Sequence, residues 1–104
     1  MTTKKNTSAR EALKEVFNQS FGQFVREIRE TDEISQTTLA KRMRVSRQFI
    51  NSVEQNKAPV SLKMAISIAK ALGCPKEAFV EIYLNDLLKK AGIKKTVYLE
   101  SKAA

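Results

Sequence analysis

Three side chains in the centre of the chain have the chemistry needed to recognise the edges of DNA bases. Arg47, Gln48 and Asn51 lie within the segment RQFINSVEQ (47–55). An arginine can donate two hydrogen bonds to guanine O6 and N7, and a glutamine or an asparagine can form two with adenine. Phe49 adds an apolar ring that either contacts a thymine methyl group or packs into the core. These four residues are the candidate base-reading set.

A helix over 47–55 would place these side chains on its outer face. At helical spacing Ile50 and Val53 fall on one side, and the polar residues fall mainly on the other. Ser46 is suited to cap this helix, and a tight break separates it from a second short helix predicted over 36–43. A pair of this kind can hold one helix outward, and a major groove about 12 Å wide admits a single helix.

Polar residues around these two helices are candidates for contacts with DNA phosphates. Helix N-termini favour phosphate through their free N–H groups and their dipole, and basic loop residues add charge. The candidate phosphate contacts are Gln36, Arg44, Ser46, Asn56 and Lys57. For Lys57, the alternative is an ordinary solvated loop lysine.

The composition favours a polyanionic partner and argues against catalysis. The 104 residues carry a net charge of +8, which favours nucleic acid or an anionic membrane surface. The chain has no histidine and no paired carboxylates in an apolar setting, so we expect no enzyme, no metal and no cofactor. The single cysteine, Cys74, excludes an intramolecular disulfide. With neither a secretory signal nor an apolar run of about 20 residues, we expect a cytoplasmic protein that does not bind membranes.

The centre of the chain, residues 35–73, resembles the helix-turn-helix domain of the phage repressor and Cro-like (xenobiotic-response-element type) transcription factors. The matching residues are Ser35-Gln36, Leu39-Ala40, Val45-Ser46, Ile50, Glu54, Lys57, Pro59, Ser61-Leu62 and Ala71-Leu72-Gly73. The resemblance implies an all-α, five-helix repressor-like domain, here with an extra N-terminal helix and a short C-terminal tail. It also implies a transcriptional regulator, most simply a repressor, with 47–55 as the recognition helix in the major groove.

The resemblance also implies roles for individual residues. Gln36 is implied to contact phosphate and to brace the first base-reading residue. Arg29 and Glu54 match a pair that forms a structural salt bridge. Arg44 and Asn56 stand where glycine is usual in the family. A left-handed arginine costs about 1 kcal/mol, and asparagine is the next best residue for that conformation.

Apolar periodicity and capping residues predict the remaining helices. Helices are predicted over 9–18, 21–31, 61–72 and 76–91, and the first two could be one long helix. We divide the chain into a basic arm with an accessory helix (1–19), the helix-turn-helix domain with a C-terminal dimerisation helix (20–91), and a tail (92–104). The tail is expected to be disordered or to form a short strand that pairs with a partner chain.

The helix over 76–91 is too apolar for a single interface. Its apolar residues spread over roughly 240° at about 100° per residue, whereas a stripe of about 100° is enough to face a core. A two-fold dimer would bury the remaining patch and place two recognition helices about 34 Å apart. The candidate dimer-interface residues are Phe79, Ile82, Tyr83, Leu84 and Leu87. Alternatively, helix 9–18 covers this face within one chain. The stretch YLNDLLKK (83–90) also resembles the dimer helix of restriction-modification controller proteins, although less closely.

Together these features predict a homodimeric regulator that binds double-stranded DNA at a palindromic operator. The alternative is an antitoxin that binds its own operator and also a toxin partner. Such a protein partner would be bound through residues 1–19 or 94–104, which lie outside the helix-turn-helix segment.

Overall fold

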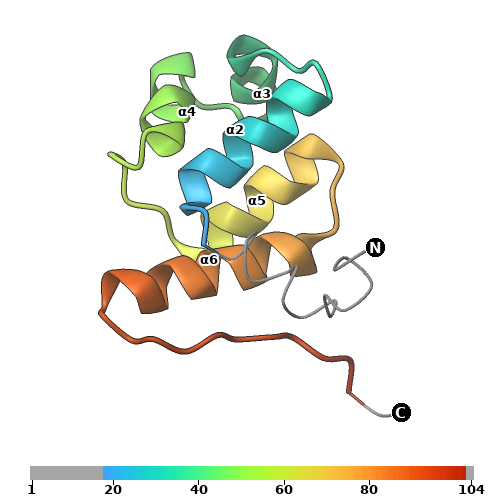
Figure 1. The fold of residues 1–104 in the computed structure, drawn as a ribbon. Coiled ribbons are helices and arrows are strands. Elements are labelled where there is room, and N and C mark those ends of the chain that lie inside the picture. Colours follow the sequence, from blue (N-terminus) through green and yellow to red (C-terminus); the bar gives the residue numbers. More distant parts are fainter. Residues whose placement is uncertain (1–17, 103–104) are drawn as a thin grey trace, which may run out of the picture.

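The computed structural model describes residues 18–102, which form five helices and no strand. The helices are α2 (Phe21–Thr31), α3 (Gln36–Met43), α4 (Arg47–Glu54), α5 (Leu62–Leu72) and α6 (Lys76–Lys90). In Figure 1, α3 and α4 lie at one end of the molecule, α2 and α5 fill the middle, and α6 crosses the other end. The predicted all-α, five-helix fold is therefore confirmed, whereas the basic arm and the helix predicted over 9–18 fall outside the described residues.

A serine caps each of the first four described helices. The hydroxyl oxygens of Ser20, Ser35, Ser46 and Ser61 each accept a hydrogen bond from the backbone N–H three residues further on. Such a cap satisfies one of the N–H groups that have no partner within the helix, and it contributes about 1 kcal/mol. These serines fix the points where the helices begin, so they also fix which side chains of α3 and α4 face outward.

One apolar core joins all five helices, and α5 lies at its centre against α2, α3 and α6. The buried apolar residues are Phe21, Val25, Leu39, Ala40, Ile50, Val53, Ala65, Ile68, Ala69, Leu72, Phe79 and Ile82. The short helices α3 and α4 contribute two residues each to this core. Their other sides are consequently left for solvent or for a partner.

Two residues that the sequence placed in a dimer interface belong to this core instead. Phe79 and Ile82 are each only 1% exposed. The ring of Phe79 packs edge-on against Phe21 and Phe24, with ring centroids 6.3 and 4.9 Å away. The side of α6 that carries Phe79 and Ile82 therefore packs against α2 and α5 of its own chain. It is not available for the predicted dimer interface.

The C-terminal tail runs back along α6, neither as a strand nor free of the domain (Figure 1). The buried side chain of Asn85 donates to the Val97 carbonyl (2.9 Å) and accepts from the Val97 N–H (2.8 Å). One amide thus satisfies both backbone groups of Val97, as a neighbouring strand would. Glu81 accepts from the N–H of Leu99 (2.6 Å), and Tyr98 packs against the core. The tail is therefore fastened at three successive residues.

The start of α2 approaches the end of α4 so closely that only glycine fits at position 22. A Cβ atom there would lie 2.3 Å from the carbonyl oxygen of Val53 and 2.8 Å from that of Glu54. Alanine is the better helix former by about 1 kcal/mol, yet we expect Gly22→Ala to lower the free energy of unfolding by about 1–3 kcal/mol. Urea denaturation measures this change in the free energy of unfolding. Gln23→Ala is the control, because Gln23 is exposed. An unchanged stability would contradict the close approach.

The turn between α3 and α4 contains a strained arginine. Arg44 caps the C-terminus of α3 with φ 59° and ψ 42°, which is the left-handed conformation. A Cβ atom costs about 1 kcal/mol in this region, so we expect Arg44→Gly to raise the free energy of unfolding by about that amount. Arg44→Ala is the matched control, because it removes the same charge and keeps the Cβ. Equal stabilities of the two variants would show that the backbone strain is absent.

Candidate nucleic-acid interface

The outer face of α4 is open to solvent at its N-terminal half. Arg47 and Gln48 are exposed, Asn51 is half-buried, and Ile50 faces the core. Phe49 is also half-buried and packs against the core. Its ring is therefore partly engaged within the protein and only partly available to a partner.

A buried ion pair lies directly behind this face. The guanidinium of Arg29 donates from Nε and Nη2 to the two carboxylate oxygens of Glu54, at 2.6 and 3.0 Å. Its Nη1 donates to the carbonyl of Ile34 (2.8 Å). The hydrogen bond with Glu54 raises the pKa of Arg29 above its usual value. The bidentate geometry joins α2 to the end of α4 and holds the two helices in a fixed relation.

Gln36 connects the ion pair to the outer face of α4. Its Nε2 donates to Glu54 Oε1 (3.0 Å) and to Asn51 Oδ1 (3.2 Å). Its Oε1 accepts from Nη1 of Arg47 (3.0 Å). The side chain therefore makes three contacts inside the protein, and its backbone N–H at the start of α3 remains as the group that could meet a phosphate.

Gln55 also contacts this network, and sequence reasoning missed it. Its Nε2 donates to Asn51 Oδ1 over 3.4 Å. Gln55 caps the C-terminus of α4 and comes four residues after Asn51, a spacing at which helical side chains are neighbours. That spacing was the signal available in the sequence.

The other candidate phosphate contacts lie before and after α4. Arg44 is exposed in the turn, and Ser46 uses its oxygen to cap α4 at Phe49 N (3.0 Å). Lys57 is exposed beyond the C-terminal end of the helix. The side chain of Asn56 is engaged with Gly22 and Ser20, so only its backbone could reach a phosphate.

Asn56 connects the end of α4 to the start of α2. It adopts the left-handed conformation, with φ 60°. Its Oδ1 accepts from the N–H of Gly22 (3.0 Å), and its Nδ2 donates to Ser20 Oγ (2.9 Å). The side chain thus acts within the fold as a second cap of α2.

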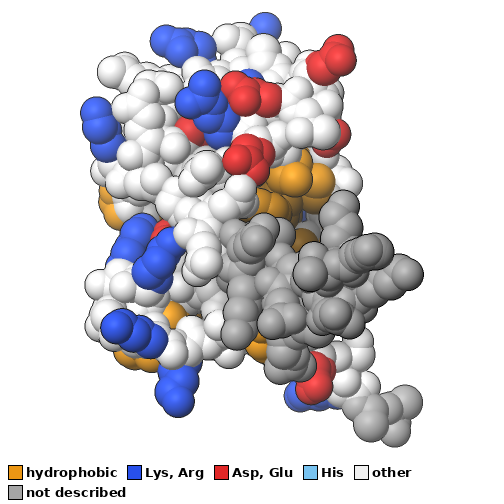
Figure 2. All heavy atoms as spheres, viewed as in Figure 1, with side chains coloured by type: hydrophobic (Ala, Val, Ile, Leu, Met, Phe, Trp, Pro, Cys, Tyr) orange, Lys and Arg blue, Asp and Glu red, His pale blue; other side chains and the backbone are white. Residues whose placement is uncertain are grey.

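The helix-turn-helix segment is strongly depleted in exposed acidic groups. Between Ile34 and Lys76, the basic residues are Lys41, Arg42, Arg44, Arg47, Lys57, Lys63, Lys70 and Lys76. Glu54 is the one acidic residue in that interval, and it is buried against Arg29. In Figure 2, Lys and Arg side chains appear at the upper end and along the left edge of the molecule, and Asp and Glu side chains also appear in its upper half. The exposed side chains of α3, α4 and the following loop therefore carry only positive charge.

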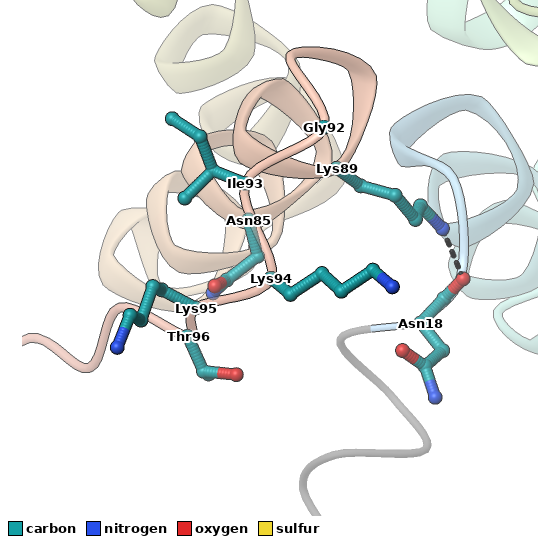
Figure 3. A pocket seen from close by; sticks show the side chains of 8 residues that line it. All are labelled: Asn18, Asn85, Lys89, Gly92, Ile93, Lys94, Lys95 and Thr96. Atoms are coloured by element: carbon teal, nitrogen blue, oxygen red, sulfur yellow. Dashed lines mark hydrogen bonds between the residues drawn. The ribbon is translucent and has the colours of Figure 1, made fainter.

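A separate pocket lies where the tail leaves α6, at the end of the molecule away from α4 (Figures 1 and 3). Its lining residues are Asn18, Asn85, Lys89, Gly92, Ile93, Lys94, Lys95 and Thr96. Lys89 donates to the carbonyl of Asn18, and Asn85 is occupied by Val97. These contacts tie the segment before α2 and the tail to α6, so they serve the fold.

The described residues provide little other chemistry. Residues 18–102 bring together no group of three His, Cys, Asp or Glu side chains that could hold a metal ion. None of the helices α2 to α6 is long and apolar enough to cross a membrane. Burial raises the pKa of the Cys74 thiol, which disfavours the reactive thiolate.

Comparisons with known proteins show the family and the fold of this chain. A crystal structure of the wild-type restriction-modification controller protein C.Esp1396I is 27% identical to this chain, with a TM-score of 0.54. The similarity covers 66% of this chain and 90% of that one. No curated protein sequence matches. The helix-turn-helix family model matches residues 25–79, which is more than half of the chain. The resemblance read from the sequence is thus confirmed, and the chain belongs to the helix-turn-helix family of Cro/C1-type DNA-binding regulators.

Proposed function

We propose that this protein is a sequence-specific regulator of transcription that binds double-stranded DNA with α4 in the major groove. The observation that carries the proposal is the open half of α4, where Arg47 and Asn51 are held from behind by Gln36. Side chains that are fixed before binding lose less conformational freedom when they meet base edges. The similarity to a controller protein supports a regulatory role, and repression by occluding a promoter is the simplest mechanism.

The surroundings of α4 suit the DNA backbone. The N-termini of α3 and α4 present free N–H groups, which attract phosphate. Arg44 and Lys57 flank the helix and are exposed. Because the acidic residue of this segment, Glu54, is buried and paired, nothing exposed on α3 and α4 repels a phosphate. The net charge of +8 adds a favourable long-range attraction to DNA.

We further propose that the protein acts as a homodimer on a palindromic site. A groove beside α6 is lined by apolar residues, among them Pro59, Val60 and Leu87, and by the polar residues Asn56, Asp86 and Lys90. Leu87 is 44% exposed, so a second copy of this chain seated here would bury it. Tyr83 is a weaker candidate for the dimer interface than Leu87, because its hydroxyl donates to the Val60 carbonyl of its own chain (2.7 Å). Two-fold pairing would match a site with two half-sites about one helical turn apart.

A charge at Leu87 should split this dimer. We expect Leu87→Glu to be monomeric in sedimentation velocity, because the carboxylate would have to be buried without a partner. Leu99→Glu is the matched control, since Leu99 is similarly exposed (40%) and lies on the tail. A Leu87→Glu protein that remains dimeric, or a wild-type protein that is monomeric at micromolar concentration, would remove this interface from the proposal.

The proposed function is tested by selecting bound sequences from random duplex DNA. The full-length protein should enrich one short sequence, arranged as a palindrome with half-sites about 10 base pairs apart. Binding without enrichment of any sequence would leave only non-specific attraction to DNA and would refute sequence-specific regulation. Enrichment of a single unrepeated half-site would retain base recognition and refute the two-fold arrangement.

A further inference from the structure

The hydrogen-bond network behind α4 determines which atoms Asn51 offers to DNA. The orientation of the Gln36 amide is unambiguous, because a carboxylate only accepts and a guanidinium only donates. Its NH₂ group must face Glu54 Oε1 (3.0 Å), and its oxygen must face Arg47 Nη1 (3.0 Å). The second hydrogen of the same NH₂ group is then directed to Asn51, at 3.2 Å.

This orientation propagates to the amide of Asn51. Since Gln36 donates, the group that faces it must be Oδ1, and Gln55 donates to the same oxygen over 3.4 Å. A carbonyl oxygen has two lone pairs, so its accepting capacity is used within the protein. Among the described residues, Nδ2 of Asn51 has no hydrogen-bond partner. Asn51 therefore offers donors to a ligand and keeps its acceptor to the protein.

A donor-only asparagine distinguishes the purines. Guanine presents two acceptors in the major groove, O6 and N7, whereas adenine presents the N7 acceptor and the N6 amino donor. The usual two-bond pairing with adenine needs a free Oδ1, and without it the adenine amino group would be left unpaired. If α4 enters the major groove as proposed above, we infer that Asn51 recognises guanine and not adenine.

The free donors and acceptors of the neighbouring side chains determine their base preferences in the same way. Arg47 carries donors only, so it also favours guanine. Gln48 is exposed, and no side-chain hydrogen bond holds it within the described part of the chain. It keeps both its donor and its acceptor and is the residue of this face suited to adenine. Each half-site should consequently contain two guanine contacts, from Arg47 and Asn51.

The test compares the four base pairs at each position of the selected site, using the wild-type protein and Asn51→Ala. The variant should lose the preference at one position of each half-site, which identifies the base that Asn51 reads. We expect the wild-type protein to bind a guanine at that position about tenfold more tightly than an adenine. A preference for adenine there, or unchanged preferences at every position in Asn51→Ala, would overturn the inference. Either result leaves the proposed function standing, whereas failure to enrich any sequence would refute the function itself.

A second variant tests the cause of the preference. Gln36→Met keeps the length of the side chain and removes the donor that occupies Asn51 Oδ1. The released oxygen can accept from adenine, so the tenfold preference for guanine at the Asn51 position should fall towards parity. Circular dichroism verifies that the variant is folded. A folded Gln36→Met protein with an unchanged guanine preference would show that Gln36 does not orient Asn51.

Discussion

Glu54→Ala should lower the free energy of unfolding by about 3–5 kcal/mol, which is a large part of the total for a small domain. The substitution leaves Arg29 buried at 9% exposure with the Ile34 carbonyl as its main remaining partner. It also removes one of the two acceptors of Gln36 and so loosens the support of Arg47. Urea denaturation, monitored by far-UV circular dichroism, measures the change in the free energy of unfolding.

Two variants show whether the loss comes from an unpaired buried charge. Glu30→Ala is the control, because Glu30 is exposed and lies 3.9 Å from Arg29. Exposed pairs contribute at most about 1 kcal/mol, so its effect should be small. A double variant, Arg29→Met with Glu54→Leu, should recover much of the lost stability, because it leaves no buried charge. A loss below about 1 kcal/mol in Glu54→Ala would contradict the structural role of the pair.

Arg47→Ala should weaken binding to the selected operator by about 1–3 kcal/mol and relax the preference for one base pair in each half-site. The guanidinium is held by Gln36 Oε1, so part of the side-chain ordering needed for binding is already present. Titrations against the selected duplex and an unrelated duplex measure the two effects. An equal loss on both would mean that Arg47 contacts the backbone and reads no base.

Lys57→Ala should affect DNA binding differently from Arg47→Ala. Lys57 is exposed at the end of α4, where a phosphate contact is expected. Its removal should weaken binding to both duplexes by the same factor and lower the salt slope by about one. If the slope is unchanged, Lys57 is an ordinary solvated lysine.

The helix-turn-helix region was predictable from sequence because its determinants are local. The capping serines and the spacing of Leu39, Ile50 and Val53 fix where each helix begins and which face it buries. The left-handed turn at Arg44 and the pairing of Arg29 with Glu54 were predicted from the family resemblance. Local spacing alone does not show that Arg29 and Glu54, which lie on different helices, are in contact.

The features that sequence reasoning missed depend on tertiary contacts. Packing against α2 and α5 decides which apolar residues of α6 are buried in the core and which stay exposed. The apolar periodicity of the sequence does not show which side of the helix makes this contact. The tail was expected to be free or to pair with another chain, yet a side chain 12 residues away, Asn85, binds Val97. The orientation of the Asn51 amide follows from Gln36, which lies on a different helix.

Chemical protection of the operator tests most directly whether α4 lies in the major groove. Dimethyl sulfate methylates guanine N7 in the major groove and adenine N3 in the minor groove. We expect the bound protein to protect guanine N7 in both half-sites, and Arg47→Ala to lose protection at one guanine in each. Protection confined to adenine N3, or protection of guanine N7 that is the same in wild type and Arg47→Ala, would contradict the placement of this helix on DNA.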